Sequence, residues 1–120
     1  MKRDMELVRV ILTATEAAEG PYNPADLVPA GWSMQEIAYH VELLSSHGLI
    51  DSRVNRFKGG ASVTVHGLTW NGCDYLDAIR DERVWEETKR VIAESVGSAT
   101  MAVVKSTAVK VMERLIDAAI

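Results

Sequence analysis

The chain has 120 residues, of which 48% are hydrophobic, which allows one compact core and argues against a second independent domain. Seventeen acidic and 13 basic residues give a net charge of −4, which argues against binding nucleic acid or an anionic membrane by bulk charge alone. A single cysteine, Cys73, excludes an internal disulfide framework and a multi-cysteine zinc site, and fits a reducing cytosol. Because no stretch reaches the roughly 18 apolar residues of a membrane span, we expect a cytoplasmic protein.

The first third of the chain predicts two helices separated by a proline-rich connector. Apolar residues three and four apart predict an amphipathic helix over residues 2–19. All three prolines fall in residues 20–32, "GPYNPADLVPAGW", which leaves room for at most one helical turn, with Asn23 as its cap and Pro24 in first position. Ser33 followed by Glu36 then indicates a capping box that opens a helix to His47.

A β-hairpin is predicted after this second helix. Gly48 stops the helix, and "LIDSRVNRF" alternates apolar and polar residues typical of a strand. The glycines of "KGG" suit a tight turn, and "ASVTVHGL" returns as the partner strand. The hairpin has the size of a wing.

Three helical segments follow the hairpin. Thr69 is expected to cap "WNGCDYLDAIRD", with Cys73, Leu76 and Ile79 on its buried face. "ERVWEETKRVIAES" continues with Val84, Trp85 and Ile92 as apolar contacts. The last segment, residues 99–120, places apolar residues at heptad spacing, namely Met101, Val104, Ala108, Val111, Leu115 and Ala118.

This order of elements predicts a mostly helical α+β chain: a winged helix (helix, connector, helix, β-hairpin wing, helix) with additional C-terminal helices. We assign residues 1–81 to the winged-helix domain and residues 82–120 to a helical extension. Three stretches, "MKRDMELVRVIL", "SMQEIAYHVELLSSHGLID" and "GLTWNGCDYLDAIRDERVWEETK", together resemble a bacterial and prophage family of short proteins catalogued as a domain of unknown function. That resemblance covers almost the whole chain and implies a winged-helix fold. "YHVELLSSHGLI" followed by "LTWNG" is also similar to the recognition helix and post-wing segment of MarR-type and ArsR-type repressors.

The helix from Ser33 to His47 is the candidate reader of bases. With its apolar stripe in the core it would present Gln35, Tyr39, Glu42, Ser45 and Ser46 outward. Gln35 could read an adenine edge, and Tyr39 or the serines could contact phosphate. Because Glu36 and Glu42 lie near this surface and would repel phosphate, the alternative is a solvated face over a structural helix.

The predicted wing carries Arg53, Arg56 and Lys58, and no acid occurs between residues 52 and 73. Three cations at a hairpin tip suit a phosphate backbone or a minor groove. The alternative is protection of a sheet edge by positive charge.

Neither a metal site nor an active site is predicted. His40 and His47 lie two helical turns apart, about 10.5 Å along the axis, so they cannot share a zinc ion, and His40 is expected to be a partly buried packing residue. The chain lacks a phosphate-binding glycine loop and a serine elbow, and no histidine stands at a catalytic spacing from Cys73. We therefore expect no enzyme and no cofactor.

The sequence is compatible with two functions of different classes. The first is a dimeric winged-helix regulator of transcription, of phage, prophage or bacterial origin, that binds double-stranded DNA through Gln35, Tyr39, Ser45, Arg53, Arg56 and Lys58. The second is a winged-helix module that binds a host or phage protein and no DNA. In both, the helix over residues 99–120 is apolar beyond a single stripe and should be covered. It could fold back on the first helix of its own chain or pair with a second copy. Because it is apolar nearly all round, we expect it to pack on both, with a homo-oligomer interface at Met101, Val104, Ala108, Val111 and Leu115.

Overall fold

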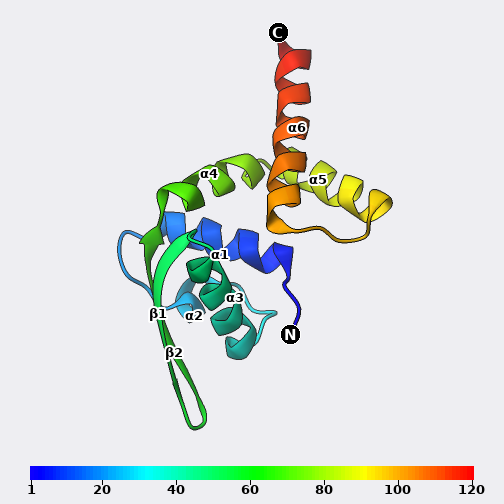
Figure 1. The fold of residues 1–120 in the computed structure, drawn as a ribbon. Helices are drawn as coiled ribbons and strands as arrows, with labels where there is room; N and C mark the ends of the chain where they lie inside the picture. Colours follow the sequence, from blue (N-terminus) through cyan, green and yellow to red (C-terminus); the bar gives the residue numbers. More distant parts are fainter. The chain divides into compact units, whose positions relative to one another are not determined.

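The computed structural model describes all residues, 1–120 (Figure 1). It is a mixed α+β chain, 61% helical, with six helices and one antiparallel hairpin of two strands. The elements in chain order are α1 (Met5–Ala17), α2 (Pro24–Leu27), α3 (Met34–Ser46), β1 (Ile50–Phe57), β2 (Gly60–Leu68), α4 (Trp70–Ile79), α5 (Glu82–Ser95) and α6 (Met101–Ala119).

The chain forms two compact units, Met1–Asp74 and Tyr75–Ile120. The first unit holds α1, α2, α3 and the hairpin, together with the start of α4. The second holds the rest of α4, α5 and α6. The domain boundary predicted between residues 81 and 82 lies within the second unit.

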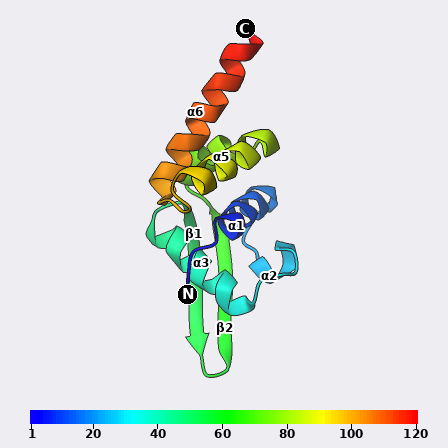
Figure 2. The same ribbon diagram turned by 90° about the vertical axis from the view of Figure 1, so that its right-hand side faces the viewer.

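The core of the first unit lies between α1, α3 and the hairpin (Figure 2). Helix α1 contributes the three-and-four repeat Leu7, Val8, Ile11 and Leu12, all buried, and α3 contributes Ile37, Ala38, Val41 and Leu44. Strand β2 completes the core with Val63 and Val65. The hairpin thus has a buried inner face and, by strand alternation, an outer face directed to solvent.

Local signals in the sequence set the ends of these elements. The capping box of α3 is confirmed, since Glu36 donates its backbone N–H to the Ser33 hydroxyl and its carboxylate accepts from the Ser33 N–H. Asn23 caps the single turn of α2 with Pro24 in first position, as predicted. Gly48 ends α3 with a φ of 81°, a backbone conformation that favours glycine.

Strands β1 and β2 pair from Ile50 opposite Leu68 to Phe57 opposite Gly60, with one register shift between Asp51 and Ser52. Lys58 and Gly59 form the two-residue turn, and Gly59 has a φ of 98°. Tyr22, in the connector, adds a short antiparallel bridge to Val65 on the outer edge of β2. The connector is therefore fixed to the hairpin rather than loose beside it.

Helix α4 begins at a close approach to the turn after α3. The Thr69 hydroxyl accepts from the Gly72 N–H at 3.0 Å, so the predicted cap is confirmed, and it donates to the Gly48 carbonyl at 2.5 Å. A Cβ on Gly72 would lie 1.9 Å from the backbone oxygen of Leu49. The buried side of α4 follows Gly72, Tyr75, Leu76 and Ile79. The prediction that Cys73 lies on this buried side is wrong: it is exposed, because it falls one position outside that repeat.

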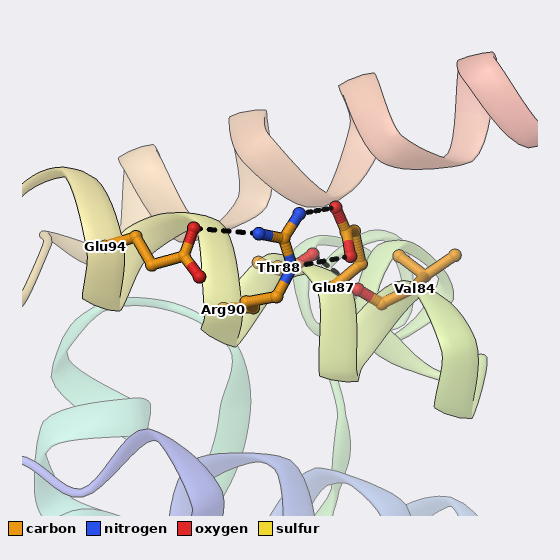
Figure 3. A network of polar contacts seen from close by, with 5 residues as sticks. All are labelled: Val84, Glu87, Thr88, Arg90 and Glu94. Atoms are coloured by element: carbon orange, nitrogen blue, oxygen red, sulfur yellow. Dashed lines mark hydrogen bonds and ion pairs between the residues drawn. The ribbon is translucent and has the colours of Figure 1, made fainter.

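In the second unit α5 packs against α6. Val84 and Trp85 of α5 are buried, while Ile92 is half-buried. The solvent side of α5 is a network of its own charges, in which Arg90 binds both Glu87 and Glu94 (Figure 3). The Tyr75 hydroxyl donates to the Met101 carbonyl at 2.9 Å and ties α4 to the start of α6.

Four of the five residues predicted to form an oligomer interface are buried within the chain itself, namely Met101, Val104, Ala108 and Val111. They are therefore not available to a second copy. The fifth residue, Leu115, is 38% exposed, because the last turns of α6 are exposed to solvent. Ala118, which we placed on the same seam, is also exposed.

Candidate nucleic-acid interface

Arg53 and Arg56, predicted to act together, lie on opposite faces of the hairpin. Side chains alternate along a strand, so Ser52, Val54 and Arg56 share the face that turns toward α3. Arg53 lies on the outer face and is exposed, and Lys58 is exposed in the turn. Neither Arg53 nor Lys58 forms an ion pair.

Arg56 binds Glu42 of α3. Its Nε donates to Oε1 of Glu42 at 3.0 Å, and Nη2 lies 2.8 Å from the same oxygen. The pair is solvent-exposed and contributes little to stability, but it pairs one of the predicted phosphate ligands with an internal carboxylate. It also neutralises one of the two acids that argued against an α3 contact with phosphate.

The outward side of α3 carries uncharged polar side chains. Gln35 and Ser46 are exposed and Tyr39 is half-buried, at the four- and seven-residue spacing that places them on one side of a helix. Glu42 lies between them and is held by Arg56, while Glu36 is engaged in the capping box. We call Gln35, Tyr39 and Ser46 the α3 crest.

Of the predicted contacts on α3, Ser45 is placed less favourably. It is half-buried and lines a shallow hollow with Ser52 and Val54 of β1. Gln35 lies at a second hollow, between the start of α3 and the hairpin tip, with Arg56 and Phe57 on its wall. The hairpin therefore borders the α3 crest on one side.

The other side of α3 is fixed to the N-terminal segment through His40, which is only 1% exposed. The Asp4 N–H donates to Nε2 of His40 at 2.8 Å, so the ring carries its proton on Nδ1 and donates it to the Glu36 carbonyl at 2.7 Å. His40 is thus more deeply buried than expected, and both its nitrogens have partners.

Asp4 joins three parts of the first unit. Its carboxylate caps α1 by accepting from the N–H groups of Glu6 and Leu7 and also accepts from the Trp32 indole at 3.0 Å. Burial alone would raise the pKa of the Asp4 carboxyl, but hydrogen bonds from Trp32 and from backbone N–H groups of α1 outweigh that effect, and the pKa lies below its ordinary value. The carboxylate therefore stays ionised while it holds this junction.

No group of three or more His, Cys, Asp or Glu side chains is arranged to hold a metal ion. None of the helices is long and apolar enough to cross a membrane.

Sequence comparison assigns the chain to a family. A family profile described as "Hypothetical protein (DUF2513)" matches residues 2–99. The chain belongs to the DUF2513 family. The match ends just before α6, and the membership predicted from three sequence stretches is thereby confirmed. An "Uncharacterized protein" of Haemophilus influenzae is similar to this DUF2513 chain, with 29% identity over 119 residues that cover 97% of this chain and 99% of that protein. No solved structure is significantly similar to this DUF2513 chain.

Two cations of this DUF2513 chain were missed by reasoning from sequence. Lys2 and Arg3 are exposed, form no ion pair, and directly precede Asp4. Lys2 and Arg3 lie near α3 because Asp4 is hydrogen-bonded to His40. These two residues are 36 positions apart, so no local sequence pattern predicts the contact. In contrast, several basic residues of α4, α5 and their junction are paired with neighbouring acids, namely Arg80, Arg83, Lys89 and Arg90.

Proposed function

We propose that this protein binds double-stranded DNA through the α3 crest and the hairpin of a winged-helix domain, and that it acts as a transcriptional regulator of phage, prophage or bacterial origin. The order α1, connector, α3, hairpin, α4 supports the winged-helix assignment, with α3 as the recognition helix and the hairpin as the wing. The observation that carries the proposal is the charge arrangement. Arg53 and Lys58 are unpaired on a hairpin whose only acid, Asp51, lies at the start of β1. Glu42 is paired with Arg56, and Glu36 accepts a hydrogen bond in the capping box of α3.

In this proposal Arg53 and Lys58 contact phosphates, and Gln35 faces base edges in the major groove. Tyr39 and Ser46 contact the backbone or bases beside it. Arg56 is a secondary contact because it must first leave Glu42. The net charge of −4 does not oppose this arrangement, since charge acts over about 10 Å at moderate salt and the unpaired cations are local.

The test is a fluorescence-anisotropy titration of mixed-sequence duplex DNA over a salt series, with wild type and Arg53→Ala/Lys58→Ala. Loss of two phosphate contacts should reduce the log–log salt slope by about two per bound chain and weaken binding roughly fifty-fold at about 0.1 M salt. Lys105→Ala/Lys110→Ala is the matched control, since it removes the same charge from unpaired residues of α6. Gln35→Ala should leave non-specific affinity intact and change sequence preference.

The competing function, a module that binds a host or phage protein, makes the opposite forecast. Wild type would then fail to shift any duplex at low salt, and capture of a protein partner would survive the Arg53→Ala/Lys58→Ala change. That result would overturn the DNA proposal.

We propose further that the protein self-associates through the last turns of α6. Leu115, Ile116 and Ile120 are 38%, 52% and 98% exposed, an apolar surface that the chain does not cover. Glu113, Arg114 and Asp117 lie among them, so an antiparallel pair of α6 helices allows Arg114 of one copy to meet carboxylates of the other. The proposed oligomer interface therefore lies at the exposed C-terminal end of α6 and not at the buried residues from Met101 to Val111.

Light scattering at a protein concentration on the order of tens of micromolar measures this self-association. Wild type should behave as a dimer, and Leu115→Glu/Ile116→Glu should behave as a folded monomer, because both residues lie on the uncovered surface. Val103→Glu is a control at an exposed residue near the other end of α6 and should leave the dimer intact. A monomeric wild type would end the proposal.

A further inference from the structure

The N-terminal segment, residues 1–3, enters the fold at a fixed point. Asp4 is held by α1, by the Trp32 indole and by the buried His40. Five hydrogen bonds to a single residue, including one from the Val8 N–H to the Asp4 carbonyl, restrict both its backbone and its side chain. The direction in which the chain leaves Asp4 toward Arg3 is therefore set by α3 as well as by α1.

This segment runs beside α3 on the side away from the hairpin (Figures 1 and 2). The hairpin contacts α3 at Glu42 and Ser45, whereas Asp4 contacts α3 at His40. At 3.6 residues per turn, His40 lies on the opposite flank of the helix from Glu42 and Ser45. The α3 crest lies between these flanks. Unpaired cations thus stand on both sides of it, Arg53 and Lys58 on the hairpin and Lys2 and Arg3 on the N-terminal segment.

We propose that Lys2 and Arg3 form a second phosphate contact, on the DNA strand that borders α3 opposite the hairpin, and that His40 is the positioning residue for it. The inference rests on the proposed DNA binding and names two more ligands for it. A helix in the major groove is bordered by a phosphate backbone on each side, and positive charge on each flank of α3 complements that arrangement. The His40 ring contributes because its Nε2 accepts the Asp4 N–H.

The experiment is the same salt series on the full chain with Lys2→Ala/Arg3→Ala. Two fewer phosphate contacts should reduce the slope by about two and weaken binding roughly fifty-fold at about 0.1 M salt, while the Gln35-dependent sequence preference remains. Lys105→Ala/Lys110→Ala again provides the control of equal net charge.

The positioning role of His40 is tested by His40→Leu and His40→Gln. Leu removes the acceptor for the Asp4 N–H, so the salt slope should fall toward that of Lys2→Ala/Arg3→Ala; Gln keeps an acceptor oxygen and should restore much of the slope. Comparable far-ultraviolet circular dichroism for the two variants shows that both are folded. If His40→Leu does not fold, His40→Phe, which also lacks an acceptor for the Asp4 N–H, replaces it.

The outcomes separate the two claims. If Lys2→Ala/Arg3→Ala binds with the wild-type slope while Arg53→Ala/Lys58→Ala loses two contacts, the N-terminal contact is wrong and the proposed function stands. If wild type binds no duplex at low salt, both are wrong. An equal slope for His40→Leu and wild type would overturn the positioning role alone.

Discussion

Trp85→Ala should lower the free energy of unfolding by about 3 to 5 kcal/mol, the range measured for removal of a large aromatic side chain from a core. Trp85 is 1% exposed and is the largest fully buried side chain of the protein. The remaining cavity cannot be filled without moving α5, whose other buried side chains, Val84 and Thr88, lie on the same side of the helix.

Trp70→Ala is the matched control for this prediction, since Trp70 is 83% exposed. Its change in stability should stay within about 0.5 kcal/mol. Urea denaturation followed by circular dichroism measures both variants without relying on the tryptophan that is removed. Equal effects of the two substitutions would contradict the burial of Trp85.

Gly72→Ala should destabilise the protein by about 3 kcal/mol or more, at the upper end of what overpacking costs. The added Cβ would meet the Leu49 backbone oxygen at 1.9 Å, and that oxygen cannot move freely because it also accepts the Thr69 N–H at 3.0 Å. The start of α4 must therefore separate from the turn after α3, which exposes the Thr69 contacts to water.

Gly20→Ala serves as the control, because a Cβ at Gly20 meets nothing within 4 Å and its backbone is not in the left-handed region. It should be neutral or slightly stabilising, since alanine restricts the unfolded chain. Thermal melting of the two variants compares them directly. A Gly72→Ala protein that melts with the wild type would show that Leu49 and Gly72 do not approach each other as described.

The features that sequence predicted are those set within a few residues. The Ser33 capping box, the Asn23-Pro24 turn and the Gly48 stop each depend on hydrogen bonds or φ values inside one turn of chain. Alternation and the "KGG" turn likewise predict the hairpin and the place of its turn. For these elements local chemistry suffices.

The features that sequence missed depend on which elements meet. The pairing of Arg56 with Glu42 needs the inner face of β1 to lie on α3, and the anchoring of Asp4 by His40 needs α1 against the same helix. Periodicity alone placed the apolar residues of α6 from Met101 to Ala118 on one side of the helix. It could not show that α5 packs against this helix, so that Met101, Val104, Ala108 and Val111 are buried while Leu115 is 38% exposed.

The central claim, that the α3 crest and the hairpin contact duplex DNA, is tested most directly by nuclear magnetic resonance of the isotope-labelled full chain. Mixed-sequence duplex is added at low salt, and backbone amide shifts are followed residue by residue. We predict the largest changes at Gln35 to Ser46, at the hairpin from Arg53 to Gly60, and at Lys2 and Arg3, with attenuation as salt rises. Absence of any change at low salt, or changes confined to α5 and α6, would contradict it.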